Sequence, residues 1–326
     1  MICTVTEENL DSLSSCWTDP KYSLNWSSVF VLPPWLGTWW RVFGEGYETY
    51  IRSVRQGENI LGIAPLMKKG ETAYFMGSTD VCDYMDFIVS PGAEKEFFNT
   101  LLDELKEKGI KRLDLAHVRP DSSVITCLKP MAQDSGYSVD AVSEETSLEL
   151  ALPSDWEEYL LLLTGKQRHE VRRKLRRLAE AGSVNYRFIE DKVSISEAMD
   201  TFIMMFKDYR EDKAIFLTGQ MESFFRLLAD NMSGAGISRL GILELDDRPI
   251  ACIMCFDYND CVYLYNSGYN PEYNHLSAGL MSKVLAVQDS IRRHKKVFDF
   301  LKGAESYKYH LGGNEVPLCR CLIDMK

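Results

Sequence analysis

The chain has 326 residues, of which 45% are hydrophobic and 26% are charged, values typical of a folded soluble protein. Its formal net charge of −11 argues against non-specific coating of DNA or of an anionic membrane by bulk charge. The acidity is uneven, because residues 1–150 carry 13 Lys+Arg and 23 Asp+Glu, whereas residues 151–326 carry 24 and 25.

The sequence predicts a cytoplasmic protein. No apolar run approaches the roughly 18–20 residues that span a bilayer, and Glu7 and Glu8 stand where a signal peptide has basic and apolar regions. Nine cysteines without a repeated spacing fit a reducing compartment. Cys252 and Cys255 match C-x-x-C within an apolar strand, where positions i and i+3 face opposite sides. We therefore expect buried free thiols there, and no metal site.

The first half is expected to begin with a three-stranded meander at residues 49–54, 60–67 and 72–76. A candidate strand at 81–89 follows. Next come a helix that carries Phe98, Leu101, Leu102 and Leu105, and a strand over 112–118. A linker near residues 140–155 is expected to divide the chain into domains 1–150 and 151–326.

The second half begins with helices. Three of them are predicted to start at capping-box sequences, at residues 154–157, 164–167 and 194–197. A fourth helix carries Phe224, Phe225, Leu227 and Leu228. These helices precede a second meander.

This meander comprises strands 239–245, 249–258 and 261–268, joined by two-residue polar turns. A helix over 278–293, a strand over 297–301 and a last strand over 316–323 complete the chain. Leu113-Asp-Leu115 resembles Phe298-Asp-Phe300, and each follows a helix. Two copies of one meander–helix–strand unit are therefore our hypothesis.

The strongest local signal is a basic helix with seven cations within twelve residues, from Lys166 to Arg177. Arg168, Arg172 and Arg176 share one face, where like charges at i, i+4 repel each other. This arrangement favours an anionic partner. A solvated helix face and docking against the acidic first half are the alternatives.

Two further segments predict a ligand site. In the loop 269–279, the small residues 277–279 open a helix, whose N-terminal N–H groups suit a phosphate. An ordinary N-cap at Ser277 is the alternative. Tyr307 and Lys308 follow a strand end, where polar groups often line a site, and a plain surface loop is the alternative there.

Several catalytic motifs are missing from the sequence. It contains no G-x-S-x-G, G-x-G-x-x-G or P-loop, and its five histidines show no helical metal spacing. Dehydrogenase, kinase, serine-hydrolase and zinc-protease functions are therefore disfavoured.

Taken together, these residues resemble the GNAT (N-acetyltransferase) superfamily, and more narrowly the CelD/Fem-like acyltransferases with two tandem GNAT-like domains. The helix 168–178 is similar to that family's R-x-x-x-R-x-x-x-R segment, the loop 265–279 to its SGYDP…SPG loop, and residues 299–308 to its DFLxGxxxYK end. Residues 34–40 and 83–86 also look like family segments. The resemblance implies an α/β (α+β) fold, in which each domain is a mixed, largely antiparallel sheet flanked by helices.

The chain also departs from the superfamily pattern. The usual pyrophosphate loop reads Q/R-x-x-G-x-G/A, and this loop lacks the first Gly and the basic residue. Asn270 and Ala278 stand where the family often has Asp and Pro.

The resemblance implies transfer of an acyl group, acetyl from acetyl-CoA in the leading hypothesis, to an amine of a small molecule, sugar or peptide. Tyr307 is the candidate acid and Glu244 the candidate base. The donor-binding residues it implies are Asn266, Gly268, Asn274, His275, Leu276, Ser277, Ala278 and Gly279. The substrate-binding residues it implies are Arg168, Arg172, Lys308, Asp299, Tyr84 and Asp86. The acceptor is expected in a cleft between the domains.

Two other functions stay open. A Fem-type transferase would take its acyl group from aminoacyl-tRNA and would bind RNA through the basic helix. A GNAT-like protein without catalytic activity would bind a ligand only. The expected acceptors are small molecules and polysaccharide or peptidoglycan precursors, with no DNA or membrane partner.

Overall fold

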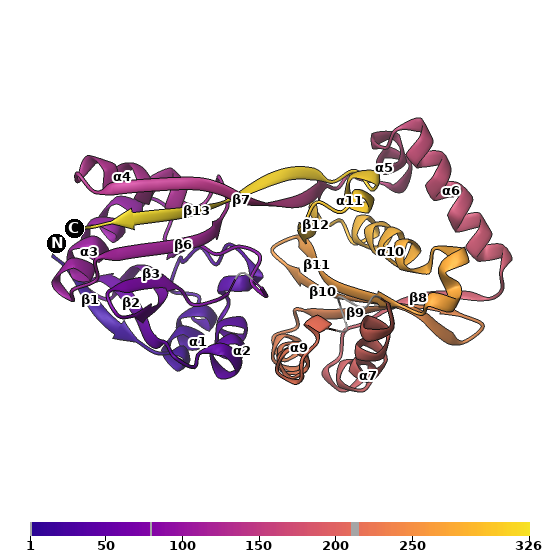
Figure 1. The fold of residues 1–326 in the computed structure, drawn as a ribbon, viewed down its shortest axis with the longest axis horizontal. Helices are drawn as coiled ribbons and strands as arrows, with labels where there is room; N and C mark the ends of the chain where they lie inside the picture. Colours follow the sequence, from indigo (N-terminus) through magenta and orange to yellow (C-terminus); the bar gives the residue numbers. More distant parts are fainter. Residues whose placement is uncertain (1, 79, 210–214) are drawn as a thin grey trace. The chain divides into compact units, whose positions relative to one another are not determined.

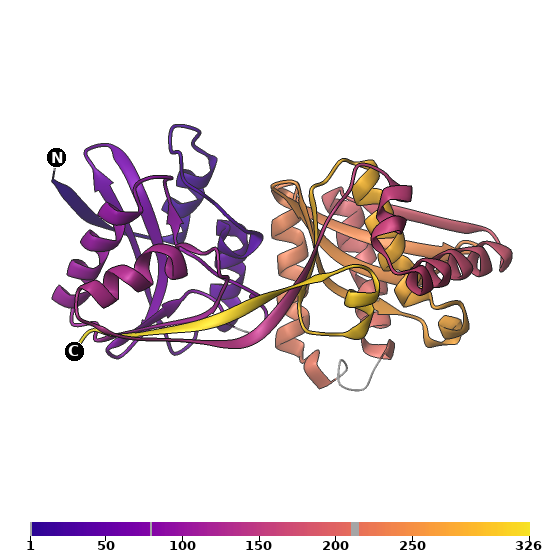
Figure 2. The same ribbon diagram turned by 90° about the horizontal axis from the view of Figure 1, so that it is seen from above.

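The computed structural model describes residues 2–78, 80–209 and 215–326, and the chain divides into two compact units. Unit 1 comprises Met1–Thr146 and Val316–Lys326, and unit 2 comprises Ser147–Glu315 (Figure 1). The chain passes from one unit to the other along strands β7 (Ser138–Ala151) and β13 (Asn314–Asp324) (Figure 2).

The predicted domain boundary at residue 150 differs from this division in one respect. Residues 316–326 lie in unit 1 because β13 pairs antiparallel with β6 (Arg112–Val118), from Cys319↔Val118 to Asp324↔Arg112. Such a pairing joins residues about 200 positions apart, so local sequence patterns do not reveal it.

Unit 1 is built around a sheet with the order β1-β2-β3-β4-β6-β13. Its other strands are β1 (Cys3–Glu8), β2 (Glu48–Gln56), β3 (Asn59–Lys69), β4 (Thr72–Phe75) and the short β5 (Ile88–Val89) beside β3. Its helices are α1 (Leu10–Thr18), α2 (Pro33–Phe43), α3 (Glu94–Glu107) and α4 (Lys129–Asp134), with short helical turns at Val29–Val31 and Val124–Leu128. The strand expected over 81–89 is thus limited to its last residues.

Unit 2 has a sheet with the order β7-β12-β11-β10-β9-β8. Its strands besides β7 are β8 (Val184–Ile189), β9 (Ser238–Leu245), β10 (Arg248–Tyr258), β11 (Cys261–Tyr269) and β12 (Val297–Lys302). Its helices are α5 (Trp156–Leu162), α6 (Gly165–Glu180), α7 (Lys192–Tyr209), α9 (Gly219–Gly234), α10 (Ala278–Arg292) and α11 (Ser306–His310), with a 3₁₀ segment at Pro271–Leu276. Helices α7 and α9 cover one face of this sheet and α10 covers the other (Figure 1).

The same arrangement occurs in both units, which confirms the predicted fold class. In unit 1 the antiparallel meander β2-β3-β4 is followed by α3 and by β6, which runs parallel to β4. In unit 2 the meander β9-β10-β11 is followed by α10 and by β12, which runs parallel to β11. Even the registers correspond, because Tyr74 lies opposite Asp114 and Tyr263 lies opposite Asp299.

The N-terminal capping residues of α5, α6 and α7 agree with the prediction in one case and differ from it in two. Thr164 caps α6 through the predicted capping box with Gln167. The cap of α5 is Asp155 rather than Ser154, since the Asp155 carboxylate accepts from the Glu158 N–H at 2.9 Å. At α7 the Asp191 carboxylate accepts from the Ser194 N–H at 2.9 Å, so this helix begins two residues before the predicted cap. In both cases a nearby Asp supplies the capping oxygen instead of the predicted Ser.

Cys252 and Cys255 are buried free thiols on β10, as expected. Burial in the apolar core raises the pKa of the Cys255 thiol to about 12. Over the described residues, no group of three His, Cys, Asp or Glu side chains is arranged to hold a metal ion. Within those same residues, no helix is both long and apolar enough to cross a membrane.

Candidate functional site

The neighbouring strands β11 and β12 diverge part of the way along the sheet of unit 2. Their parallel ladder contains three residue pairs and ends at Tyr263↔Asp299. Farther along, β12 pairs with β7 through Leu301 and Lys302, while β11 continues beside β10 to Tyr269. A register shift in the β10–β11 ladder, where Met254 pairs with Asn266 and Cys255 with Leu264, adds a bulge to β11 at the same level.

A cavity of about 570 Å³ lies where the strands diverge. Side chains from the end of β11, the start of α10, the start of α11 and helix α6 line it. Four of the residues predicted to be functional contribute to its wall: Asn274, Ser277, Gly279 and Tyr307. The structure therefore brings together segments that the sequence analysis singled out separately.

The N-terminus of α10 opens into this cavity without a side-chain cap. Ser277 precedes the helix in the left-handed conformation, with φ 57° and ψ 39°, and its side chain forms no capping hydrogen bond. Gly279 is required in the first turn because a Cβ there would lie 2.3 Å from the ring of Tyr269. Uncapped N–H groups at a helix N-terminus are well suited to bind an anionic group.

Two lysines add positive charge to the cavity. Lys174 comes from the basic helix, and Lys283 comes from α10, one turn after Gly279. The Lys283 ammonium donates to the Gly279 carbonyl at 2.8 Å and lies 5.1 Å from the centre of the Tyr307 ring. Beside the cavity, Arg177 donates to the His275 carbonyl at 2.8 Å and so joins α6 to the loop before α10.

The basic helix thus approaches the cavity with a different face from the one predicted. Arg172 pairs with Glu157 at 2.7 Å, and Arg168 donates to the Leu160 carbonyl at 3.4 Å. Both contacts join α6 to α5. Neither arginine lines the cavity, to which Lys174 belongs.

Alternation along β11 decides which of its residues face the cavity. Ser267 and Tyr269 line it, so Asn266 and Gly268 point to the opposite face. There a Cβ on Gly268 would lie 2.4 Å from the backbone of Met205 in α7. Gly268 is therefore needed for packing and does not contribute to a donor site through that face.

We expect Gly268→Ala to lower the free energy of unfolding by about 3 kcal/mol. The added methyl group would clash with the backbone of α7, which cannot move aside by a change of side-chain rotamer. Gly219→Ala is the matched control, since a Cβ at this helical glycine meets nothing within 4 Å. Urea titration of both variants measures the difference. Equal midpoints would show that α7 moves aside at little cost.

Three other residues predicted to bind the donor lie elsewhere. Leu276 and Ala278 are buried in the core of unit 2. The ring nitrogen Nδ1 of His275 is 3.1 Å from the Glu272 carbonyl within the 3₁₀ segment. These side chains hold the loop in place and do not form the cavity wall.

Lys308 is a structural residue at the end of β12. Its ammonium donates to the carbonyls of Leu301, Lys302 and Gly303 at 2.9, 2.6 and 3.0 Å. It also pairs with Glu305 at 2.8 Å, and its side chain is 3% exposed. An ammonium has three protons, and these three carbonyls accept them.

Asp299 is structural as well. It is 1% exposed, and its carboxylate accepts from the Leu301 N–H at 2.8 Å. Leu301 has a left-handed φ of 63°. Asp299 and Lys308 together stabilise the strained end of β12. The segment that carries Tyr307 follows directly after this end.

The predicted base and the first-half residues lie outside the cavity. Glu244 on β9 accepts from Asn185 at 2.8 Å and from Arg187 at 3.0 Å. In unit 1, Tyr84 packs edge-on against Phe30, with 5.0 Å between ring centres. Asp86 accepts from the Ser123 N–H and hydroxyl at 2.9 and 2.6 Å, which opposes the rise in its pKa caused by burial.

The cavity wall also includes polar residues that were not predicted as site residues: Lys174, Ser267, Lys283, Glu305 and Ser306. Two local rules would have found some of them. Ser267 follows from strand alternation with Gly268 in the packed position, and Lys283 follows from the i, i+4 spacing with Gly279. Glu305 is the more useful addition, because it places a carboxylate in the cavity wall where Glu244 does not.

Unit 2 thus has two neighbouring parallel strands that diverge and a helix N-terminus that faces the gap between them. Residues 165–309 match the family described as Acetyltransferase (GNAT) domain. The match lies within unit 2, which therefore has the fold of a GNAT domain. Comparison with curated protein sequences finds no match.

Solved structures share this fold over most or all of the chain. A crystal structure of FemX is 12% identical, with a TM-score of 0.68, and the match covers 98% of this chain and 96% of that one. A conserved protein of unknown function from Bacteroides thetaiotaomicron is 10% identical, with a TM-score of 0.62, and the match covers 99% and 100%. The C-terminal domain of a putative lysylphosphatidylglycerol synthetase from Agrobacterium fabrum is 11% identical, with a TM-score of 0.54, and the match covers 81% and 80%. These findings confirm the predicted resemblance to tandem, Fem-like GNAT proteins.

Proposed function

We propose that this protein transfers an acyl group from an acyl-CoA, acetyl-CoA in the first instance, to an amine. The observation that carries the proposal is the uncapped N-terminus of α10, which opens into a cavity beside Tyr307. The nine free cysteines fit a reducing, cytoplasmic setting for this reaction.

The donor is proposed to bind with its pyrophosphate at the start of α10. Backbone N–H groups of the first turn would bind the phosphate oxygens, with Lys174 and Lys283 on either side. The acyl arm would extend into the space between the diverging ends of β11 and β12. This placement needs neither the glycine nor the basic residue that the loop lacks, since the lysines supply the charge from two helices.

The chemistry then follows as ordinary acyl transfer. The lone pair of the acceptor amine attacks the thioester carbonyl, and backbone N–H groups of β11 are proposed to stabilise the oxyanion, by about 3 kcal/mol for one donor. The C–S bond breaks as the tetrahedral intermediate collapses. Tyr307 would protonate the leaving thiolate, and Glu305 would take the proton from the amine, directly or through water.

The acceptor is proposed to be a small molecule or a peptidoglycan or polysaccharide precursor with a free amine. Similarity of fold to FemX supports a precursor of this kind, and the sugar amine, amino acid and peptide classes all offer the required nucleophile. A panel of amines from each class, assayed for release of free CoA thiol, identifies the class.

Thermal unfolding with acetyl-CoA, longer acyl-CoAs and free CoA tests the donor. We expect a rise in melting temperature with at least one of them, reduced in Lys174→Gln and retained in Lys166→Gln, which changes an exposed lysine of the same helix outside the cavity. No shift with any CoA species would remove the proposal. A shift without thiol release for any amine would instead indicate a binding protein without catalytic activity.

The alternative is a transferase that uses aminoacyl-tRNA. It is favoured by the FemX-like fold and by the exposed cations of α6, among them Lys166, Arg172 and Arg176. Such binding would weaken steeply with salt. For each phosphate contact, the logarithm of the binding constant would fall by roughly 0.7–0.9 when the salt concentration rises tenfold. Filter binding of bulk tRNA between 50 and 300 mM salt distinguishes this from a CoA-dependent enzyme.

A further inference from the structure

A second cavity in unit 2, of about 850 Å³, lies at the other end of α10. The first residues of α5, the strand β8 and the last turns of α10 line it. Helix α10 has 15 residues, so its two ends are about 22 Å apart at 1.5 Å per residue. This groove, called the α10 C-terminal groove below, is therefore distinct from the donor cavity.

One wall of the groove is apolar and largely aromatic. It is formed by Trp156, Tyr186, Phe188 and Leu285, all partly exposed. Tyr186 and Phe188 lie edge to face with 5.5 Å between ring centres. The Arg239 guanidinium lies 3.9 Å from the centre of the Phe188 ring, which fixes that ring in place. Such a wall is suited to a flat apolar group.

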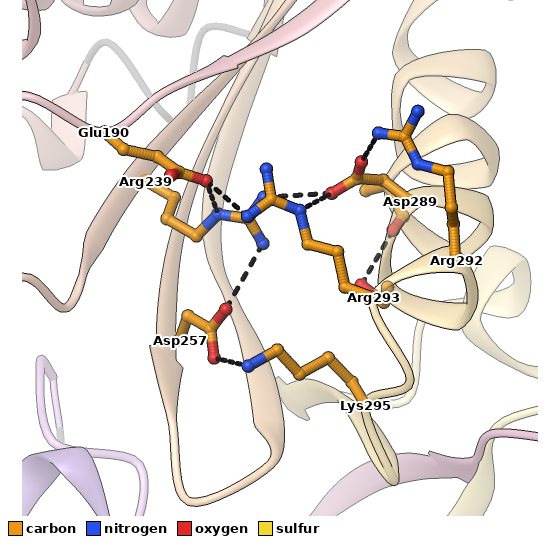
Figure 3. Close-up of polar contacts among 9 residues, drawn as sticks. Glu190, Arg239, Asp257, Asp289, Arg292, Arg293 and Lys295 are labelled. Carbon is orange, nitrogen blue, oxygen red and sulfur yellow. Dashed lines mark hydrogen bonds and ion pairs between the residues drawn. The ribbon is translucent and has the colours of Figure 1, made fainter.

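A network of charges lies beside that wall (Figure 3). Asp289 accepts from Arg239 at 2.9 Å, from Arg293 at 3.0 Å and from Arg292. Glu190 accepts from Arg239 at 2.9 Å and from Arg293 at 2.8 Å. A single carboxylate, Asp289, thus serves three guanidinium groups.

The network as drawn carries surplus positive charge. Asp257 pairs with Lys295 at 2.6 Å and with Arg239 at 3.5 Å (Figure 3). Four cations therefore share three carboxylates, Glu190, Asp257 and Asp289. Within this network the surplus is one unit charge. Asp155, whose carboxylate caps α5, and Arg187, which pairs with Glu244, also line the groove. The positive charge offered to a ligand therefore lies on the exposed guanidinium groups of the network.

Two exposed arginines of the network line the groove. The Arg239 side chain is 3% exposed and forms the fixed centre. Arg292 is 76% exposed and Arg293 is 39% exposed, and both line the groove. Two adjacent guanidinium groups are suited to the several oxygens of a phosphate.

We infer that the α10 C-terminal groove binds a planar aromatic group that carries a phosphate, as in a nucleoside monophosphate. The ring lies against Trp156 and Phe188, and Arg292 and Arg293 bind the phosphate. A neutral aromatic molecule leaves Arg292 and Arg293 without an anion to bind, and a free phosphate leaves the aromatic wall exposed. Both parts of the ligand are therefore needed.

Calorimetric titration at low salt tests this site, with AMP as the probe and with adenosine and inorganic phosphate as its two halves. We expect AMP to bind at least tenfold more tightly than either half. Arg292→Gln is expected to weaken AMP binding about tenfold. Arg248→Gln, which changes an exposed arginine of unit 2 outside the groove, leaves binding unchanged.

Two further variants locate the bound probe. Trp156→Leu is expected to weaken AMP but not phosphate, and its melting temperature shows whether the fold is retained. Lys174→Gln changes the donor cavity and is expected to leave AMP binding intact. The inference is overturned if AMP gives no heat at millimolar concentration, if Arg292→Gln binds as tightly as the parent, or if binding is lost in Lys174→Gln. It is also overturned if phosphate alone binds as tightly as AMP.

Discussion

Replacing Lys308 with methionine is expected to lower the free energy of unfolding of unit 2 by about 3–5 kcal/mol. The side chain is 3% exposed and its ammonium donates to three backbone carbonyls at 2.6–3.0 Å. Methionine fills similar volume but supplies no donor, so the carbonyls stay desolvated without their partner. Glu305 is 52% exposed, so water hydrates its carboxylate in the variant. Loss of the ion pair with Glu305 therefore adds little to the destabilisation.

Urea unfolding monitored by circular dichroism measures this loss. Lys296→Met is the matched control, because that lysine is 78% exposed, and its pair with Asp260 is a surface contact. The control should unfold at nearly the parental urea concentration. If Lys308→Met keeps its stability and instead loses affinity for an acyl-CoA, the substrate role inferred from sequence is restored.

The elements that sequence predicted well are those with local signals. The turns Asp246-Asp247 and Asn259-Asp260 have left-handed φ values between 49° and 62°, as the two-residue hairpins require. The bounds of β9, β10 and β11 accordingly agree with the prediction within one residue at each end. Asp and Asn tolerate this conformation, which is why their pairs indicated the turns.

The elements that sequence did not predict depend on distant partners. A linker was expected near residues 140–155, yet residues 138–151 form β7, which pairs with β12 from Ser147 to Ala151. A strand whose side chains are mostly exposed has no apolar alternation to reveal it. The same holds for β13, whose place in unit 1 is set by β6.

At the site, the sequence indicated the segments that meet at the cavity but not which of their side chains line it. The family-like ends of β11 and β12 do meet at one cavity, but a polar residue type does not show which way its side chain points. Lys308 and Asp299 read as ligand-binding groups, whereas both bind backbone atoms of the β12 end. Arg168 and Arg172 were predicted to form one anion-binding face, whereas both side chains contact residues of α5. Burial and partner geometry, which arise only from packing, separate these roles.

Tyr307→Phe is expected to lower kcat by about 10²–10³-fold in the proposed reaction while leaving affinity for the donor unchanged. The phenyl ring keeps its edge-on contact with Phe300, at 6.5 Å between centres, and its place beside Lys283 at 5.1 Å. Only the hydroxyl is lost, so the leaving thiolate departs without a proton donor. Steady-state release of CoA thiol, with donor affinity from thermal shift, separates the two quantities.

Tyr309→Phe is the control for that experiment. Tyr309 lies two residues further along α11, and its hydroxyl donates to Glu315 at 2.5 Å outside the cavity. Its loss should leave kcat near the parental value. If both variants turn over at the parental rate, thiolate departure needs no protein acid, and Tyr307 only shapes the wall. If Tyr307→Phe loses donor binding along with turnover, the hydroxyl holds the donor in both the ground state and the transition state, and the acid role is excluded.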